Sequence, residues 1–543
     1  MLKIRRALIS VYDKRGIVEF AETLHQLKTE LVASSGTATL LKMRGLPVTE
    51  ISELTSHPEI LEGRVKTLHP LVHGGILADK TKPEHLTSLK RYGIKPIDMV
   101  VVNLYPFEKE KDVTNLNGSL EYMDIGGNTL LRAAAKNFKN VAVVTEPELY
   151  APISEELKRN GGALTQATLL NLAIKALTTT FQYELSILNY LQEFKSTHTY
   201  EEEGDHFVFK KEYKDESSNL FPHFVAAIYE KVSSLRYGEN PHQKAALYRE
   251  LKPFFPFSEK EVLFSGVING EQLQGKALSY NNYVDLDGAV KILLDFDEPT
   301  AVVIKHTNPC GLASASTICE AYKTALATDP MSAFGGVVGL NRTVDQETAK
   351  EITSSFKEAV IAPDYQEEAL KILAKKKKLR VVKLDFLKAK KPLLDFRSLN
   401  CGIILQETDE LIPKKEDLKV VTKKKPSKEH LESLLFGWKV VKHVKSNAIV
   451  FIKEKRTVGI GAGQMSRVDA VKIAAMKAGE EAKGSVMASD AFFPFRDGID
   501  AAHQAGVVAI IQPGGSIRDH EIIEAADEHN MIMVFTGVRS FNH

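Results

Sequence analysis

Cysteine is scarce in this sequence, and no segment looks like a secretion signal or a membrane anchor. The chain has three cysteines among 543 residues, at irregular spacing, so it predicts neither a disulfide framework nor a cysteine zinc site. No stretch approaches the roughly twenty apolar residues that a membrane helix needs. The amino terminus, MLKIRRALISVYDK, has two arginines but no long apolar run after them. We therefore expect a cytoplasmic protein with no membrane partner.

An excess of charge of one sign is also lacking. The 71 Lys and Arg side chains stand against 70 Asp and Glu side chains, which leaves a formal net charge of +1. This balance gives no reason to expect nucleic acid as a partner. Any anionic ligand must therefore be held by a local cluster of basic residues.

The order of apolar and helical segments predicts at least two α/β domains. A chain of 543 residues is long enough for two to four domains. In roughly the first 190 residues, helical patterns alternate with apolar runs at 7–13, 30–35, 97–107 and 141–147. Such alternation is typical of a mainly parallel sheet. Long amphipathic helices are expected at 165–194.

The remainder of the chain is predicted to form a second α/β region. The polar segment 195–207 is the best candidate for a linker, which suggests domains at 1–199 and 200–543. Strands are expected at 301–307 and 506–513. The sequence shows no short-period repeat, and the lysine-rich segments within 371–425 are predicted to be solvated.

Three clusters in the amino-terminal half could bind an anion. Residues 34–37, Ser-Ser-Gly-Thr, stand between an apolar run and a helix, where backbone N–H groups and hydroxyls can hold a phosphate. Serine and threonine are also ordinary helix caps, so this signal is weak alone. GRVKTLHP (63–70) and MDIGGNTLLRAAAKN (123–137) add further charges. Each cluster could be a solvated surface, but together they suit the strand-end loops where α/β sheets bind ligands.

These segments resemble the inosine-monophosphate cyclohydrolase domain of the bifunctional purine-synthesis enzymes. The resemblance runs through SVYDK, VASSGT, GRVKTLHP, NLYPF and DIGGNTLLRAAAKN, in the family's order and spacing. Ser35 departs from the glycine expected in the family's loop, and serine is tolerable there if its φ is negative. The resemblance implies a methylglyoxal-synthase-like parallel-sheet domain and a ribotide site formed by Ser10, Tyr12, Asp13, Lys14, Ser34, Ser35, Gly36, Thr37, Arg64, Lys66, Thr67, Asn103, Tyr105, Asp124, Gly126 and Lys136.

The chemistry of cyclisation suits this set. A weakly nucleophilic carboxamide nitrogen must attack a formamide carbonyl, and water is then lost. Cations and hydroxyl donors in a dry pocket stabilise the developing oxyanion, and Lys66, Lys136 and Tyr105 are suitable donors. Asp124 could orient or deprotonate the amide. The sequence does not decide which lysine transfers a proton.

The carboxyl-terminal half holds motifs that are individually ambiguous. His306 follows an apolar strand, where a hydrogen-bonded core histidine is the more common explanation. The glycines at 459, 461 and 463 suggest a dinucleotide loop, but no acidic partner follows on a clear strand. The segment NPCG (308–311) is similar to the zinc motif of base deaminases, but alanine at 313 leaves out the second thiolate.

Taken together, these motifs resemble the aminoimidazole-carboxamide-ribotide (AICAR) transformylase domain. The resemblance implies a duplicated cytidine-deaminase-like fold without zinc, and it allows a structural monovalent cation. It also implies 10-formyltetrahydrofolate as cosubstrate and a homodimer with this site at the interface. The implied catalytic residues are Lys305 and His306; the ribotide contacts are Arg236, Tyr237, Gly335, Glu358, Asn447 and Arg467; and the folate contacts are Phe492, Asp497, Ser516 and Arg539.

Formyl transfer gives His306 a chemical role. The 5-amino group of the ribotide is conjugated to a carboxamide and is a poor nucleophile, so a base must take its proton as it attacks the formyl carbon. Imidazole suits that task near neutral pH. Lys305 could stabilise the oxyanion or protonate the departing folate nitrogen. Adjacent residues of a strand point to opposite faces, so both can act only if the strand ends or bends there.

Two other functions fit parts of the sequence. A nicotinamide dehydrogenase could use the GIGAG loop, and a non-catalytic protein could use the basic clusters to hold a phosphorylated ligand. The first lacks the acidic ribose-binding residue, and the second has little use for Lys305 and His306. Both are much weaker hypotheses than formyl transfer to AICAR followed by cyclisation to inosine monophosphate (IMP).

Overall fold

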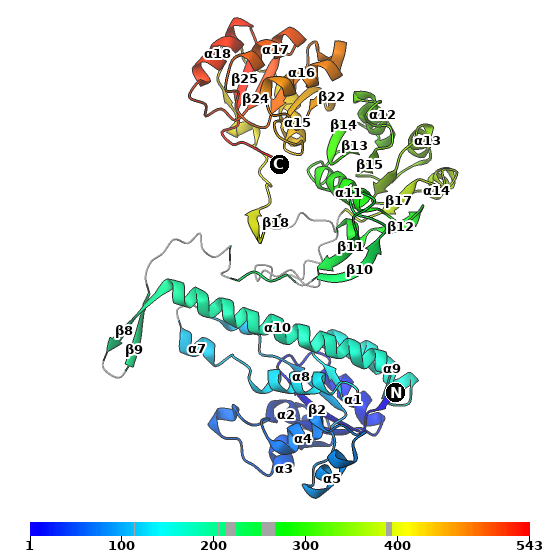
Figure 1. The fold of residues 1–543 in the computed structure, drawn as a ribbon, viewed down its shortest axis with the longest axis vertical. Helices are drawn as coiled ribbons and strands as arrows, with labels where there is room; N and C mark the ends of the chain where they lie inside the picture. The colour runs from blue at the N-terminus through cyan, green and yellow to red at the C-terminus, as the bar shows by residue number, and fades with distance from the viewer. Residues whose placement is uncertain are drawn as a thin grey trace. The chain divides into compact units, whose positions relative to one another are not determined.

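The computed structural model describes residues 1–112, 115–203, 206–211, 221, 224–227, 229–250, 266–386 and 394–543 (Figure 1). The chain forms two compact units, Met1–Ala226 and Ala227–His543. Among the described residues, no helix has both the length and the hydropathy required to cross a membrane.

A five-stranded parallel sheet organises the first unit. The strand order is β4-β3-β2-β5-β6. The strands are β2 (Arg6–Val11), β3 (Glu30–Ala33), β4 (Val48–Glu50), β5 (Met99–Asn103) and β6 (Ala142–Val144). Their apolar runs are buried on consecutive positions, as expected for parallel strands covered on both faces. This confirms the parallel α/β sheet expected for the amino-terminal region.

Helices connect these strands, and most of them pack on the sheet around one core (Figure 1). A second, smaller cluster holds Phe107 and Tyr190. The helices are α1 (Ile17–Gln26), α2 (Ser35–Met43), α3 (Ile51–Thr55), α4 (Pro70–Leu77), α5 (Pro83–Arg91), α6 (Phe107–Glu110), α7 (Leu116–Leu120), α8 (Gly126–Lys136), α9 (Tyr150–Arg159) and α10 (Gln166–Thr197), with short 3-10 turns η1 (Leu61–Gly63) and η2 (Pro147–Leu149). A small antiparallel pair joins β1 (Leu2–Lys3) to β7 (Ala163–Leu164).

The segment 195–207, expected to be a linker, holds the end of a long helix and most of a β-hairpin. Helix α10 runs as one 32-residue helix to Thr197, and β8 (His198–Glu203) and β9 (His206–Lys211) follow as an antiparallel hairpin. The residues between the two strands, 204–205, lie outside the described residues. The strand signal was weak, because HTYEEE and HFVFKK lack the alternation of apolar and polar residues that indicates a half-buried strand. The compact units divide at Ala226–Ala227, beyond the boundary expected after residue 199.

A twelve-stranded sheet organises the second unit, in the order β12-β17-β16-β15-β13-β14-β22-β21-β23-β24-β25-β20. The first half has β12 (Glu271–Gln274), β13 (Thr300–Lys305), β14 (Asn308–Ser314), β15 (Val337–Leu340), β16 (Ala359–Ala362) and β17 (Arg380–Lys383). The second half has β20 (Lys419–Val420), β21 (Ile449–Lys453), β22 (Arg456–Gly461), β23 (Val486–Ser489), β24 (Ala509–Gln512) and β25 (Ile532–Phe535).

The two halves repeat one topology and meet at β14 and β22. In each half an antiparallel hairpin leads into three mutually parallel strands, and a further antiparallel strand closes the outer edge. This confirms the expected duplication. The helices are α11 (Tyr280–Leu293), α12 (Ile318–Thr328), α13 (Gln346–Ser354) and α14 (Glu367–Leu373), then α15 (Lys428–Val441), α16 (Arg467–Ala478), α17 (Asp497–Ala505) and α18 (Asp519–Glu528).

Alternating residues of this sheet face two helix layers. Val302 and Ile304 join one core with α11 and α15 that extends across both halves. Ala301 and Val303 join a separate core with α12, α13 and α14, and α16, α17 and α18 form its counterpart in the second half. The hydrophobic core is therefore continuous between the two halves on one face of the sheet and divided on the other.

Short ribbons and turns complete the second unit. They are β10 (Tyr229–Leu235) with β11 (Ala245–Glu250), β18 (Leu394–Leu399) with β19 (Gly402–Glu407), and the 3-10 turns η4 (Val267–Asn269), η5 (Lys415–Asp417) and η6 (Gly479–Ala482). Within the lysine-rich stretch, residues 375–378 are exposed, as expected, and residues 387–393 lie outside the described residues.

Candidate functional site

The carboxyl ends of β2, β3 and β5 bring the first candidate cluster together. Asn103, the last residue of β5, pairs with Val11 of β2. Its side-chain Oδ1 accepts hydrogen bonds from the backbone N–H groups of Tyr12 (2.5 Å) and Asp13 (2.8 Å), and its Nδ2 donates to Asp13 O at 3.1 Å. Asn103 therefore fixes the loop after β2, which also carries Lys14, while Ser10 lies within β2 itself.

The loop between β3 and α2 has the features of a phosphate site. Ser34 is buried, and its side chain does not cap α2. Lys14 Nζ donates to Thr37 Oγ1 at 2.8 Å and to Val11 O. Burial and the neighbouring charge of Lys66 lower the pKa of Lys14. Ser35 begins α2 and is not among the residues with positive φ, so serine is tolerated where the family's glycine was expected.

Lys66, Tyr105 and Asp124 interact electrostatically. Burial raises the pKa of Asp124, while hydrogen bonds from the Gly127 and Tyr105 backbone and the charge of Lys66 oppose this rise. Burial and the charge of Asp124 raise the pKa of Tyr105. The Tyr105 ring meets that of Tyr12 edge to face, at 5.3 Å between centroids. The structure thus groups an acid, a phenol and a lysine at one end of the sheet.

Thr67 and Gly126 join the same cluster through a close approach. A Cβ placed on Gly126, at the start of α8, would stand 2.5 Å from Thr67 Oγ1, so only glycine fits. The backbone of Thr67 hydrogen-bonds the ring of His73, whose pKa is lowered by burial. Arg64, by contrast, is exposed and pairs with Glu121.

Lys136 lies apart from the other predicted residues. It ends α8, ten residues after Gly126, which corresponds to about 15 Å along the helix axis. The next residue, Asn137, donates hydrogen bonds to Ile76 O and Ala78 O, and nearby Lys80 pairs with Asp98, just before β5. Helix α8 therefore carries the exposed Lys136 toward the amino ends of the strands.

Tyr183 of α10 is a residue of this cluster that sequence reasoning missed. Its hydroxyl accepts a hydrogen bond from Asp124 N at 2.7 Å and donates one to Tyr122 O at 2.8 Å. The adjacent Glu184 accepts a hydrogen bond from Asn128 Nδ2 in α8. Helix α10 thus supports the turn that carries Asp124, and only the predicted helix, not its contacts, could be read from the sequence.

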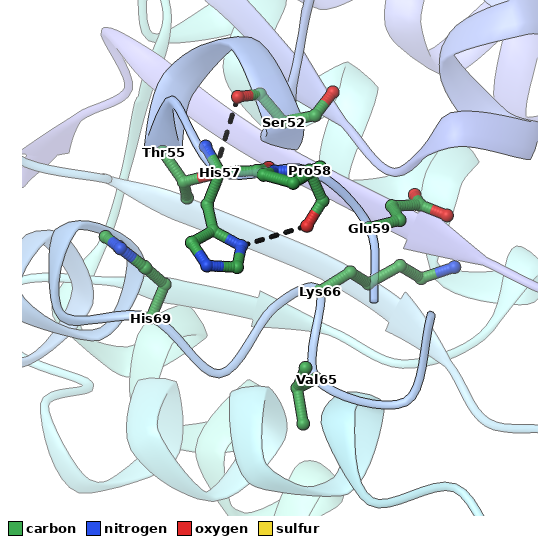
Figure 2. Close-up of a pocket in the computed structure, with 8 residues that line it drawn as sticks. All are labelled: Ser52, Thr55, His57, Pro58, Glu59, Val65, Lys66 and His69. Atoms are coloured by element: carbon green, nitrogen blue, oxygen red, sulfur yellow. Dashed lines mark hydrogen bonds between the residues drawn. The ribbon is translucent and has the colours of Figure 1, made fainter. Parts of the chain in front are cut away.

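A small cavity opens beside Lys66. It measures about 20 Å³ and is lined by Ser52, Thr55, His57, Pro58, Glu59, Val65, Lys66 and His69 (Figure 2). The rings of His57 and His69 stand 6.4 Å apart, and His57 Nδ1 lies 2.9 Å from Pro58 O. A cavity of this size holds about one water molecule.

The second candidate cluster begins at the hairpin between β13 and β14. Lys305 ends β13 and pairs with Asn308, so His306 and Thr307 form a two-residue turn, and both have positive φ (51° and 65°). This is the signature of a type I′ turn and is strained for non-glycine residues, most of all for β-branched threonine. The strand therefore ends at Lys305, as the paired roles of Lys305 and His306 require.

Neighbouring residues hold this turn. Asp285 of α11 accepts a hydrogen bond from Thr307 N at 2.7 Å, and burial raises the pKa of its carboxyl. Lys305 Nζ donates to Phe334 O at 3.0 Å, beside Gly335. Asn308 Oδ1 accepts from Lys445 N at 3.0 Å, so the turn contacts the second half of the unit. Sequence reasoning missed Asp285 and Lys445.

Asn447 and Arg467 are in direct contact. Arg467 Nη2 donates to Asn447 Oδ1 at 2.6 Å, and Arg467 Nη1 donates to Ser489 Oγ (2.8 Å) and to the buried Asp490 (2.6 Å). A cavity of about 330 Å³ lies beside them and is lined by Ser446, Asn447, Gly463, Gln464, Met465, Phe541 and His543.

The four predicted folate contacts follow the carboxyl ends of three parallel strands. Phe492 and Asp497 follow β23, Ser516 follows β24 and Arg539 follows β25. Phe492 is partly exposed, and the guanidinium of Arg539 lies over the ring of Phe541, which lines the larger cavity. These residues and Asn447 therefore share one edge of the sheet, since Ile449 of β21 pairs with Ser489 of β23.

The remaining predicted contacts lie farther along this edge or on a ribbon. Gly335 precedes β15, and Glu358 precedes β16 and pairs with Arg380 at 2.6 Å. Arg236 and Tyr237 follow β10, where the guanidinium lies 5.0 Å from the ring centroid. Glu239, in the same turn, meets Asn281 of α11.

Two suggestive motifs have structural explanations. A Cβ on Gly459 or Gly461 would stand 2.2 or 2.0 Å from carbonyl oxygens of α16, so these glycines let β22 pack closely against that helix. Cys310 is buried within β14, where burial raises the pKa of its thiol to about 11. Among the described residues, no three His, Cys, Asp or Glu side chains are grouped so as to hold a metal ion.

Known proteins match both units. Residues 134–477 match the family model described as AICARFT/IMPCHase bienzyme, and residues 16–129 match the MGS-like domain. The chain is 48% identical over 542 residues to "Bifunctional purine biosynthesis protein PurH" of Caldicellulosiruptor bescii, covering 99% of this chain and 100% of that protein.

Two further matches were found. The protein of the same description from Caldicellulosiruptor saccharolyticus is 48% identical over 541 residues, with 99% and 100% coverage. A solved structure described as "Crystal structure of ForH" is 35% identical, covers 35% of this chain and 97% of that chain, and has a TM-score of 0.33. On the family match and the full-length relatives, the chain belongs to the AICARFT/IMPCHase bienzyme family and is a bifunctional enzyme of purine biosynthesis.

Proposed function

We propose that the two reactions of this bifunctional enzyme are divided between its two compact units, with cyclisation in Met1–Ala226. The carrying observation is the grouping of Lys14, Lys66, Tyr105 and Asp124 at the carboxyl ends of parallel strands. The loop at residues 34–37 and Lys14 would hold the phosphate of the formylated ribotide. Lys66 and Tyr105 would stabilise the oxyanion formed when the carboxamide nitrogen attacks the formyl carbon.

Asp124 would orient or deprotonate the attacking amide. Its carboxylate is half-buried and is held by Gly127 N at 2.6 Å, while Tyr183 holds its backbone. Loss of water then closes the ring and gives IMP. Lys136 has no contact with this group among the described interactions, so its role rests on the family resemblance alone.

Formyl transfer is assigned to Ala227–His543 and uses a formyl-folate cosubstrate, which we propose to be 10-formyltetrahydrofolate. His306 would accept the proton of the 5-amino group as its nitrogen attacks the formyl carbon. The tetrahedral oxyanion would collapse with breakage of the bond to the folate nitrogen N10, which takes a proton from Lys305. The strained turn supports this assignment, since backbone strain of this kind clusters at active sites.

The ribotide and folate contacts lie along one edge of the sheet and span it widely. The ribotide contacts Glu358, before β16, and Asn447, before β21, are separated by five strand spacings, or roughly 24 Å. One ribotide cannot contact both ends in a single chain. We therefore assign this site to a homodimer in which a second copy brings complementary residues to the same ligand.

Exposed apolar side chains along this edge support the dimer. Met465 and Ile517 are 102% and 98% exposed, and Met331 and Phe334 are 88% and 62% exposed. Apolar side chains gathered beside an active site are typical of a protein interface. Sedimentation of the full chain should give a dimer, and an active monomer would refute this assignment.

The compartment and the division of activities complete the proposal. Cys310, Cys319 and Cys401 are all free thiols, which suits the reducing cytoplasm.

The division of the two activities between the units is tested with a fragment of residues 1–226, the whole first unit. It should cyclise added formylated ribotide and should not use formyl-folate. A folded fragment that cannot cyclise would show that the first unit is not sufficient for this activity.

A further inference from the structure

A carboxylate occupies the region where we place the ribotide phosphate. Ser35 Oγ, at the start of α2, donates a hydrogen bond to Glu59 Oε1. Glu59 also lies near Lys66: a Cβ built on Gly63 would stand 3.5 Å from Glu59 Oε2 and 3.7 Å from Lys66 Nζ. The charge of Glu59 contributes to the raised pKa of Tyr105. Figure 2 shows Glu59 and Lys66 extending from the same side of the cavity.

Glu59 and a phosphate would compete for the same donors. Helix α2 has nine residues, and the side chain of Ser34 does not cap its first N–H groups. Such groups and the helix dipole attract one anion. Glu59 already holds the hydroxyl of Ser35, the first residue of this helix. A phosphate bound at this loop therefore has to displace the carboxylate from Ser35.

The segment that carries Glu59 can move at little cost to the fold. Residues 56–62 are all exposed. Ser56, Leu61 and Glu62 have positive φ of 54°, 51° and 56°, a strained conformation for residues other than glycine. Exposed segments with few buried contacts open with the least free energy.

We propose that Glu59 is an internal anion that occupies the phosphate loop of the substrate-free protein and leaves Ser35 when the ribotide phosphate binds. This inference rests on the proposed cyclohydrolase site. Its consequence is a lowered apparent affinity for any small phosphate, because only the fraction of molecules with a displaced Glu59 can bind it. A ribotide overcomes this competition through its further contacts, so Glu59 selects against inorganic phosphate.

The test measures inorganic phosphate as a competitive inhibitor of cyclisation in the full chain. Glu59→Gln removes the charge, and Glu59→Asp keeps the charge but shortens its reach to Ser35. Both variants should bind phosphate about threefold to tenfold more tightly than the parent. Glu62→Gln is the matched control, because Glu62 is exposed on the same segment and interacts with Arg64. It should leave the phosphate inhibition constant unchanged.

Each outcome decides one point. If phosphate competes with the formylated ribotide neither in the parent nor in the two Glu59 variants, the phosphate loop itself is wrongly assigned. If phosphate competes in the parent but binds the two Glu59 variants no more tightly, the displacement mechanism is wrong. If the variants lose ribotide affinity while phosphate inhibition is unchanged, Glu59 is a ribotide ligand and not a competitor. If Glu62→Gln also bound phosphate more tightly, the effect would come from the change in net charge and not from the contact of Glu59 with Ser35.

Discussion

Replacing Asp124 with asparagine should separate the catalytic use of this carboxylate from the energetic cost of burying it. Asparagine has almost the same shape, and its Oδ1 can still accept the hydrogen bond from Gly127 N, which is 2.6 Å long in the parent. It cannot accept a proton or carry a negative charge beside Lys66. If Asp124 orients or deprotonates the attacking amide, cyclisation should fall by about a hundred- to ten-thousand-fold. Formyl transfer should be unchanged, because Lys305 and His306 belong to the other unit.

The same variant should be more stable near neutral pH. Burial raises the pKa of Asp124 above its ordinary value of 3.8, so the folded protein holds this proton more tightly than the unfolded chain does. Below that ordinary value both states are protonated, and burial carries no charge penalty. As the pH rises through the raised pKa, the folded state must bury a charge, and this contribution to stability is lost. Asparagine stays neutral, so its advantage should be present at pH 7 and disappear in acid.

The assay follows IMP formation from formylated ribotide by absorbance, beside thermal unfolding at pH 7 and at the lowest pH where the parent stays folded. Glu108→Gln is a suitable control, because Glu108 is an exposed carboxylate paired with Lys111. It should change neither quantity. An Asp124→Asn variant that cyclises at the parental rate would remove Asp124 from the chemistry. A variant that melts below the parent at pH 7 would refute the argument from burial.

Three other substitutions test the two sites. Lys66→Ala should slow cyclisation by about a hundred- to a thousand-fold and leave formyl transfer intact, and equal losses in both rates would contradict the assignment. Tyr183→Phe should lower stability by about 1–3 kcal/mol, measured by denaturant unfolding, because Asp124 N and Tyr122 O lose their partner; an unchanged midpoint would show that water replaces the hydroxyl. His306→Ala should lower formyl transfer by about a hundred- to ten-thousand-fold with an unchanged melting temperature. Activity that merely tracked the folded fraction would instead make His306 a structural residue.

Much of the grouping of residues in the first candidate cluster follows from the sequence, because parallel strands impose its geometry. The run ending in Asn103 is apolar on consecutive positions, which indicates a central strand covered on both faces. Once β2, β3 and β5 are parallel, their carboxyl ends must share one edge, and the loops with Tyr12, Ser34 and Tyr105 must lie there. The predicted order of strands and loops thus indicates that these residues lie close together.

Other features depend on contacts that no local pattern records. Tyr183 reaches Asp124 across 59 residues of sequence, and nothing around it distinguishes its hydroxyl from that of any other helical tyrosine. Lys136 belongs to the predicted site only through the family resemblance, and a helix after a parallel strand runs back toward the amino edge. The turn at His306 and Thr307 also lacks the Asn-Gly signal of a type I′ turn, so its strain could not be anticipated.

The duplication gives the large sheet two equivalent edges, and the candidate residues Asn447 and Arg467 lie on one of them. Strand β13, helix α12 and strand β15 begin 149 residues before β21, α16 and β23 (449 − 300, 467 − 318 and 486 − 337). At this offset Arg467 corresponds to the buried Ile318, and Asp490 corresponds to Asn341.

At the opposite edge, the counterparts of Asp490 and Asn447 are Asn341 and Glu298, and both have partners within the protein. Asn341 accepts a hydrogen bond from Thr300 N at 2.7 Å and donates to Phe296 O and Glu298 O, so its amide is engaged by backbone. Glu298, the counterpart of Asn447, pairs with Lys455. At that edge an apolar residue stands in the position of Arg467, and a carboxylate stands in the position of Asn447. The repeated fold supplies two equivalent scaffolds, and we expect a few side chains, foremost Arg467 and Asn447, to decide which one can bind a ribotide.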